Sequence, residues 1–181
     1  MTTTQERVLN AAIDLLGTEG LRALTHTRID AKAGVPKGST SNYFRTRAAL
    51  LEGVVDWMVK LELPAVGIAY APDSPGELAN ALCGLFEEMT GPDHRTMTSA
   101  RLVLLMEASH DSAVREALGR GRSAMEELVI PSVTRLGAPD PKLAANALAA
   151  CFEGLFLQRI ARHADVDAKS ILHTMVGAFV G

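Results

Sequence analysis

The sequence has few aromatic residues and only two cysteines among its 181 residues. Aromatic side chains make up 4% of the chain although 48% of it is hydrophobic. Leucine, valine, alanine and methionine therefore have to build the core, as they often do in helical proteins. Cys83 and Cys151 stand alone in apolar surroundings, without the Cys-x-x-Cys spacing of zinc sites. Such free thiols fit a reducing compartment, so we expect a cytoplasmic protein.

Long hydrophobic segments are absent as well. The longest run of strongly apolar residues, 102–106, is flanked by Arg101 and Glu107, whereas a helix that crosses a bilayer needs about 20 such residues. The N-terminal residues are polar and lack the apolar stretch of a signal peptide. We therefore expect no association with a membrane.

The motifs of the common enzyme classes are missing too. The sequence contains no Gly-rich nucleotide loop, no Gly-x-Ser-x-Gly and no cluster of metal ligands. The histidines stand apart from one another and from any recognisable nucleophile, at His26, His94, His110, His163 and His173. We expect no catalytic residues, no metal and no cofactor, and we do not expect an enzyme.

The net charge of −3 is unevenly distributed along the chain. Residues 1–60 contain 8 basic and 6 acidic side chains, a balance of +2, whereas residues 61–181 contain 10 and 15, a balance of −5. The acidity therefore lies in the C-terminal two-thirds, and the N-terminal third is compatible with a nucleic-acid partner.

Hydrophobic residues recur with helical spacing, and no segment alternates as a strand would. Thr3 and Glu6 form a capping-box pattern before the first helix, and Thr25 suits the N-cap of a second that runs to Ala33. Later helices are expected at about 46–63, 76–90, 95–110, 112–136, 140–163 and 167–180. Pro64 is expected to end the helix at 46–63, and residues 64–76 read as a linker. The chain is predicted to be all-α with about nine helices.

The segment after Gly34 carries the most specific signal. Gly34 supplies a turn, and Pro36 suits the first turn of a third helix. That helix has almost no bulky apolar residue before Tyr43, and it exposes one cation, small hydroxyls, an amide and a phenol. Such groups suit phosphate oxygens and base edges, so the second and third helices predict a helix-turn-helix that binds DNA.

Residues 8–55 resemble the DNA-binding domain of TetR-type (tetracycline-repressor-like) transcriptional regulators. The resemblance rests on residues in register: Ala11, Ala12, Leu15, Leu16, Gly20, Leu24, Thr25, Ile29, Ala33, Gly34, Val35, Lys37, Gly38, Tyr43, Phe44, Ala49 and Leu50. Around Ala147–Ala150 and Glu153–Gln158 the chain looks like the penultimate helix of these regulators. Three positions depart from the family pattern: Asp30 replaces a usual alanine, Thr40 a usual apolar residue, and Ser41 a usual aromatic.

The resemblance implies roles for individual residues. Thr25, Ser39, Tyr43 and Arg47 would contact phosphates, and Thr27, Lys37, Ser41 and Asn42 would face bases. Independently of the family, Lys37 in a first helical turn can donate to guanine, and Ser39 with the free N–H groups of that turn can bind a phosphate. Gly38 leaves the backbone open to the duplex. Phe44 is expected in the core, with Tyr43 pointing outward.

The C-terminal helices are expected to bind a small-molecule effector, largely apolar with a polar end, in a cavity bounded by the fourth to eighth helices. Ordinary core packing is the alternative for each lining residue. The effector-binding candidates, several of which would form a polar wall, are Trp57, Met58, Phe86, Met89, Arg101, Met106, Glu107, His110, Phe152, Glu153 and Phe156.

We expect a homodimer, because one short recognition helix touches too few bases for specificity. Its seam is predicted from residues on two helices: Leu148, Phe152, Leu155 and Phe156, with Ile171, Leu172, Met175 and Phe179. Residues 1–47 would form the DNA-binding domain, and 48–181 the effector-binding and dimerisation domain. The family implies a repressor that an effector releases from a palindromic double-stranded operator. The alternatives are a helical enzyme or carrier with a degenerate head, and a ligand-independent architectural DNA binder.

Overall fold

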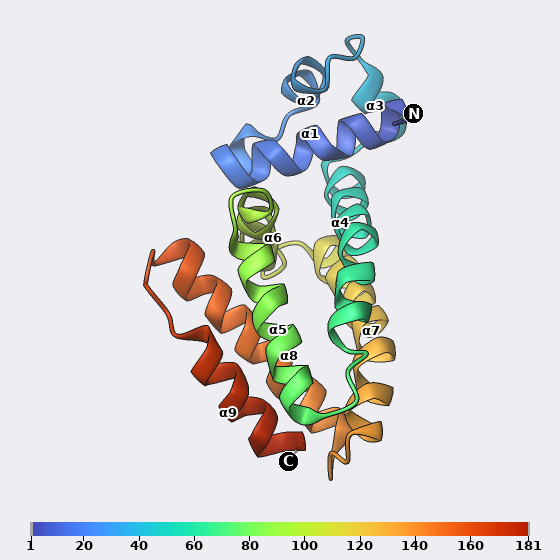
Figure 1. Ribbon diagram of the computed structural model, residues 1–181. Coiled ribbons are helices and arrows are strands. Elements are labelled where there is room, and N and C mark those ends of the chain that lie inside the picture. Colours follow the sequence, from blue (N-terminus) through green and yellow to red (C-terminus); the bar gives the residue numbers. More distant parts are fainter. Residues whose placement is uncertain (1, 181) are drawn as a thin grey trace. The chain divides into compact units, whose positions relative to one another are not determined.

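The computed structural model describes residues 2–180, and over that range every regular element is helical (Figure 1). The prediction of an all-α chain with about nine helices is therefore confirmed for this range. In order, the elements are α1 (Thr4–Glu19), η1 (Leu21–Ala23), α2 (His26–Ala33), α3 (Ser39–Tyr43), α4 (Arg47–Ala69), α5 (Pro75–Thr90), α6 (Arg95–Glu107), α7 (Ser112–Arg135), α8 (Pro141–Phe156), η2 (Leu157–Ala161) and α9 (Ala168–Val180).

The described chain divides into two compact units that do not follow its linear order. The head unit consists of residues 2–61 and 95–121, and the body unit of residues 62–94 and 122–180. Helices α4 and α7 each contribute residues to both units. The predicted boundary at residue 47 separates a DNA-binding from an effector-binding domain. These compact units do not test that functional division, so the boundary stays a prediction.

The core of the head unit forms on one face of α1. Val8, Ala12, Leu15 and Leu16 are almost fully buried there, and α1 lies across α6 and the first turns of α4 (Figure 1). Gly17 marks the closest approach, because a Cβ atom at this position would lie 2.0 Å from the backbone oxygen of Thr96 on α6. A residue without a side chain therefore lets the two helix backbones meet.

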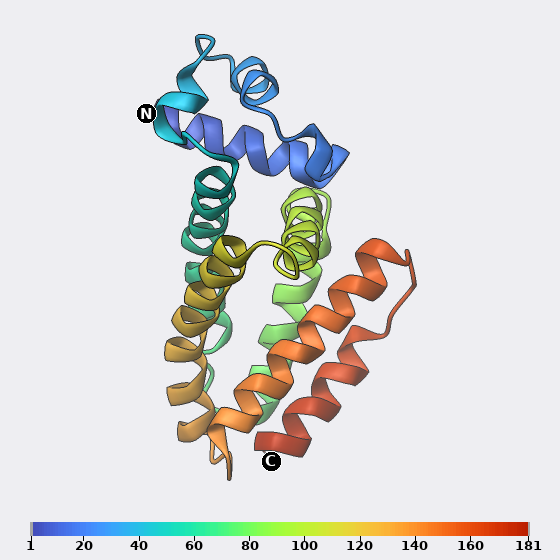
Figure 2. The same cartoon turned by 180° about the vertical axis from the view of Figure 1, so that it is seen from behind.

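The body unit packs α5, α8 and α9 against one another, with α9 running back along α8 (Figures 1 and 2). This packing corrects the predicted dimer seam. Leu148, Leu155, Phe156 and Leu172 are at most 4% exposed within a single chain. These four side chains fill the protomer's own core, because α8 and α9 pack against each other, and α9 against α5, through faces that hydrophobicity alone had assigned to a partner.

Pro64 does not end α4, contrary to the prediction. The helix continues through it to Ala69. Proline removes one N–H and leaves the carbonyl four residues earlier without its helical partner. Pro64 and Lys60 are both exposed, so water can hydrate that carbonyl.

The predicted linker at 64–76 shrinks to the few residues between α4 and α5, and it is held in place. Ser132 on α7 donates to the carbonyl of buried Tyr70. Arg135 on α7 donates to the carbonyls of Ala71 and Pro72 at 3.2 and 2.9 Å. This connection is therefore a packed part of the body unit.

Candidate nucleic-acid interface

Helix α2 begins and ends at the residues that its sequence indicates. The hydroxyl of Thr25 accepts from Arg28 N at 3.4 Å, which confirms Thr25 as the N-cap. Gly34 has a φ of 62°, in the left-handed region that favours glycine at helix ends. Arg7 on α1 adds a second cap, since its guanidinium donates to the carbonyls of Ala33 at 2.6 Å and Gly34 at 2.9 Å.

The recognition helix α3 begins later than predicted. It starts at Ser39, with Gly38 as the N-cap at a φ of 93°. Pro36 and Lys37 therefore lie in the preceding turn and not in the first turn of the helix. Gly38 is required for its backbone conformation, which L side chains rarely adopt.

The start of α3 is already occupied by a side chain of the protein. The carboxylate of Asp30 on α2 accepts from Gly38 N at 2.6 Å and from Thr40 N at 2.8 Å, and from the Thr40 hydroxyl at 2.6 Å. Ser39 N donates to the Pro36 carbonyl at 3.1 Å. The expectation that free N–H groups of this turn bind a phosphate is therefore wrong, because these three are engaged within the head.

Most of the predicted DNA-binding residues nevertheless lie at the surface. Phe44 is 7% exposed and Tyr43 47% exposed, which confirms the predicted division between them. Ser39 and Ser41 are half-buried, and their hydroxyls donate to the carbonyls of Pro36 and Gly38 at 2.6 and 2.8 Å. Gly38 is half-buried as well; the exposed members of the set are Thr25, Thr27, Lys37, Asn42, Tyr43 and Arg47.

Three cations of the head unit bind groups of the protein itself, two of them carboxylates and one of them backbone carbonyls. Arg28 forms an ion pair with Glu19 at 2.5 Å, and Lys32 forms one with Asp14. Arg47 donates to the carbonyls of Leu24 and Leu21 at 3.2 Å each, so this residue also closes η1 onto α4.

Sequence reasoning missed two residues beside this surface. Arg45 is exposed immediately after α3, and Thr46 is the exposed residue before α4, where its hydroxyl accepts from Ala49 N at 3.1 Å. The sequence places Arg45 between the third and fourth predicted helices, directly after the recognition helix. A cation at that position is a signal that could have identified it.

Trp57, an expected effector residue, lies instead at a surface groove of the head unit. Its indole N–H donates to Asn10 Oδ1 at 2.8 Å, and Lys60 Nζ lies 5.0 Å from its ring centre. The groove has a volume of about 460 Å³ and is lined by Gln5, Leu9, Phe44, Ala49, Glu52, Gly53, Asp56, Trp57 and Lys60. Met58, the next candidate, is 4% exposed and belongs to the core of the same unit.

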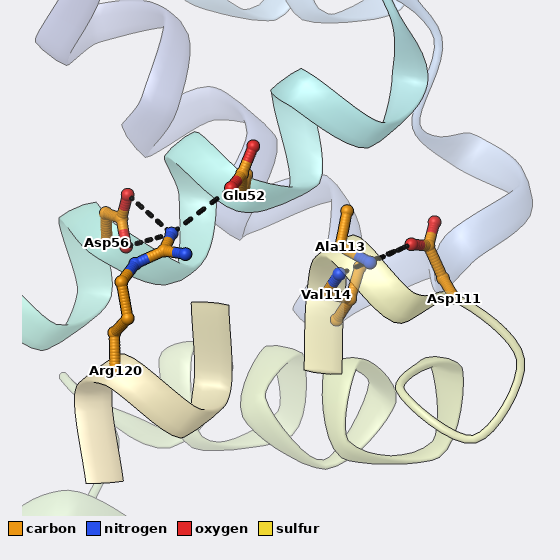
Figure 3. Close-up of polar contacts among 6 residues, drawn as sticks. All are labelled: Glu52, Asp56, Asp111, Ala113, Val114 and Arg120. Atoms are coloured by element: carbon orange, nitrogen blue, oxygen red, sulfur yellow. Dashed lines mark hydrogen bonds and ion pairs between the residues drawn. The ribbon is translucent and has the colours of Figure 1, made fainter. Parts of the chain in front are cut away.

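Helix α7 is tied to α4 inside the head unit (Figure 3). The Arg120 guanidinium donates to Glu52 at 3.3 Å and to Asp56 at 3.2 Å (Figure 3). At the start of α7, Asp111 caps the N–H groups of Ala113 and Val114 at 2.9 and 3.3 Å (Figure 3).

The remaining effector candidates fall into both units. In the head unit, Arg101 and Glu107 are half-buried, His110 is exposed, and Met106 is 72% exposed. In the body unit, Met89 is buried and Glu153 is exposed, 3.9 Å from Arg122.

Three aromatic candidates gather in the body unit. Phe86 stacks on Phe156 with ring centres 5.8 Å apart. Phe152 packs edge-on against both rings, at 6.4 and 5.7 Å. Arg159 lies over the Phe86 ring at 5.0 Å and pairs with Glu87 at 3.2 Å. The result is an aromatic cluster with a cation at one side.

Among residues 2–180, no three His, Cys, Asp or Glu side chains are grouped so that they could hold a metal ion. Within the same range, none of the helices combines the length and the apolar character that a bilayer span requires.

Comparisons with known proteins agree with the helix-turn-helix geometry. Residues 8–54 match the family described as bacterial regulatory proteins, tetR family. Residues 73–181 match the tetracyclin repressor-like C-terminal domain. No match was found among curated proteins.

Solved structures share the fold at low sequence identity. A transcriptional regulator from Rhodococcus sp. Rha1 is 18% identical with a TM-score of 0.83, over 98% of this chain and 96% of the other. The multidrug binding protein EbrR complexed with ethidium is 22% identical with a TM-score of 0.79, over 99% of each chain. E. coli NemR in its reduced form is 15% identical with a TM-score of 0.80, over 99% and 98%.

Proposed function

The chain belongs to the tetR family of bacterial regulatory proteins, and we propose that it is a homodimeric repressor that a small molecule releases from its operator. The DNA-binding part of this proposal rests on the surface formed by α3 and by the turn before it. Thr40 and Phe44 are buried there, whereas Lys37, Asn42 and Tyr43 are exposed. Buried residues that hold a short helix in place, together with exposed donors beside it, suit insertion into a major groove.

We expect Lys37→Ala to weaken operator binding by roughly 1–3 kcal/mol and to blur the base preference at one position, because a lysine at a base edge carries sequence information. The operator is first selected by the wild-type protein from a pool of random duplexes. Binding is then measured by fluorescence anisotropy at several salt concentrations.

Lys169→Ala is the matched control, since it removes the same charge from an exposed position on α9. This variant should bind the operator like the wild type. If Lys37→Ala binds like the control at every salt concentration, the turn before α3 does not contact DNA. If the wild type selects no sequence at all, the DNA-binding assignment itself is wrong.

The proposed dimer uses a stripe that runs along α8 to Leu157, the first residue of η2, and that is exposed except at half-buried Ala147. Leu143 and Leu157 are 53% and 44% exposed, and Ala147, Ala150 and Gly154 lie between them at alternating spacings of four and three residues. Ile171 on α9 adds a side chain that is 38% exposed. Small residues at this spacing let a second helix approach closely, and a two-fold axis would pair the stripe with itself.

The proposed effector site draws on the aromatic cluster of the body unit. Phe152 is only half-buried, so one ring of the cluster is accessible. EbrR, a relative in fold, is a multidrug binding protein complexed with ethidium. These observations support a largely apolar, partly polar ligand. Among the predicted candidates, the residues proposed for it are those of the body unit: Phe86, Met89, Phe152, Glu153 and Phe156.

We expect Phe152→Ala to weaken ethidium binding about tenfold, since an aromatic contact contributes roughly 0.5–1.5 kcal/mol beyond burial. Ethidium fluorescence is titrated with protein alone, because this dye also intercalates into DNA. Ile68→Ala is the control, as Ile68 is a 76% exposed side chain in the same unit. Equal ethidium affinities in the two variants would contradict the assignment of the aromatic cluster.

The proposed release is a shift between two populations. A ligand can change operator affinity only if it binds one arrangement of the helices more tightly than the other. Helices α4 and α7 contribute residues to both units, and Arg120 connects them within the head. A movement of these helices would change the separation of the two recognition helices in a dimer, and a coupling of about 1–3 kcal/mol is usual for such a link.

A further inference from the structure

Asp30 bonds to four backbone positions, three in the turn that leads into the recognition helix and one, Thr40, inside that helix. Its backbone carbonyl accepts from Gly34 N and from Val35 N, the latter at 3.0 Å. Its carboxylate accepts from Gly38 N and Thr40 N at 2.6 and 2.8 Å. One residue in the second half of α2 therefore holds the chain at several points between positions 34 and 40.

The partner of this carboxylate is as deeply buried as the carboxylate itself. Asp30 is 3% exposed and Thr40 is 0% exposed, and the Thr40 hydroxyl donates to Asp30 Oδ1 at 2.6 Å. A buried charge is costly unless hydrogen bonds satisfy it. Burial raises the pKa of Asp30, but hydrogen bonds from Thr40 and Gly38 outweigh it, and the net shift of the pKa is downward. The carboxylate is therefore ionised, and donors of the turn stabilise it.

The recognition helix cannot hold this position by itself. It has five residues, fewer than an isolated helix needs to be stable. Phe44 anchors its C-terminal end in the core, and the Asp30–Thr40 contact anchors its N-terminal end. Lys37 and Asn42 are exposed next to these anchors, so their positions follow from both.

The same contact explains two of the three departures from the family pattern. Asp30 stands where alanine is usual and Thr40 where an apolar side chain is usual, and the structure shows that the two form a single interaction. Two apolar side chains at these positions would also pack together, but their contact would not favour one orientation of the two helices. A carboxylate with three donors fixes both the distance and the orientation of α3 relative to α2, because hydrogen bonds are directional.

We propose that Asp30 and Thr40 are positioning residues for sequence recognition, which hold the turn and α3 in the one orientation that aligns Lys37 and Asn42 with base edges. This inference rests on the proposed DNA-binding function. It predicts that disturbing the pair lowers specificity, meaning the ratio of operator affinity to non-specific affinity. General attraction to the phosphate backbone changes little, because the exposed cations remain.

The test compares three variants on the operator that the wild type selects and on a scrambled duplex of equal length. Asp30→Asn keeps the shape of the side chain but turns an amide NH₂ toward one of the donors. We expect its specificity ratio to fall about 10- to 100-fold, the cost of misaligning one or two base contacts. Thr40→Val removes the hydroxyl at similar volume, and its ratio should fall about tenfold. Thr40→Ser retains the hydroxyl and should stay within about twofold of the wild type.

Affinity for the scrambled duplex and helical content by circular dichroism identify variants that merely unfold. Should Asp30→Asn fail to fold, Asp30→Ala/Thr40→Val supplies an apolar pair without a buried charge. We expect that double variant to fold, to bind scrambled DNA like the wild type and to lack the wild-type preference. A wild-type specificity ratio in Thr40→Val or in the double variant would overturn the proposal. So would a parallel fall of both affinities in folded variants. A wild type without any preferred sequence would refute the DNA-binding function instead.

Discussion

A glutamate at Ala150 is expected to convert the protein into a monomer and to lower its operator affinity at least about 100-fold. Ala150 lies in the middle of the exposed α8 stripe between Leu143 and Leu157. In a self-complementary interface the substitution acts twice, and it places two carboxylates in a desolvated contact without partners. Two linked recognition helices gain roughly 10²- to 10⁴-fold over one, and a monomer loses this gain.

Sedimentation velocity at micromolar concentration measures the oligomeric state, and anisotropy measures operator binding. Thr134→Glu is the control, since it adds the same charge at an exposed position of α7 outside the stripe. Phe152→Asp would be a poorer test, because Phe152 packs against Phe86 and Phe156 within one chain. An Ala150→Glu variant that sediments as a dimer would place the interface elsewhere.

The sequence predicted those features of the fold that depend on near neighbours. The capping box of Thr3 and Glu6 and the N-cap of Thr25 are both present, because each involves residues only three positions apart. The inward position of Phe44 and the outward position of Tyr43 were predicted as well, and the two adjacent side chains diverge where α3 ends at Tyr43. Local rules hold wherever the partner of a residue lies within the next turn.

Pro64 shows where a local rule depends on information that the sequence lacks. Proline was expected to end α4, yet both Pro64 in α4 and Pro131 in α7 lie inside helices. Both prolines are exposed, and so are the residues four positions before them, Lys60 and Glu127. Exposure decides whether the released carbonyl is satisfied by water, and exposure is a property of the fold.

The candidate site was predictable as a surface but not in its internal contacts. Asp30 and Thr40 each looked like an isolated departure, because they stand ten positions apart and the sequence does not reveal their contact. Late initiation of α3 at Ser39 has the same origin, since a carboxylate from α2 caps the helix. The effector residues posed a harder problem: helical spacing assigns Trp57 and Phe152 to faces of their helices, but it does not reveal that they belong to different compact units.

Gly17→Ala is expected to destabilise the head unit strongly although it adds a single methyl group. The new Cβ would lie 2.0 Å from the Thr96 backbone oxygen and 2.7 Å from Thr96 Cγ2. A carbonyl oxygen within α6 cannot rotate away as a flexible side chain can, so α1 and α6 have to separate. Overpacking of this kind costs roughly 1–3 kcal/mol or more in free energy of unfolding. It exceeds the gain of up to about 1 kcal/mol from replacing a helical glycine by alanine.

Gly119→Ala separates the gain in helix propensity from the cost of the steric clash. Gly119 is an exposed residue of α7 in the same unit, and a Cβ there would meet nothing within 4 Å. This control retains the gain in helix propensity without the clash, so its melting temperature by differential scanning calorimetry should rise by a few degrees. Gly17→Ala should melt roughly 5–10 °C below the wild type. If both variants were stabilised equally, α1 and α6 would not approach through Gly17, because the methyl group would then have found open space at both positions.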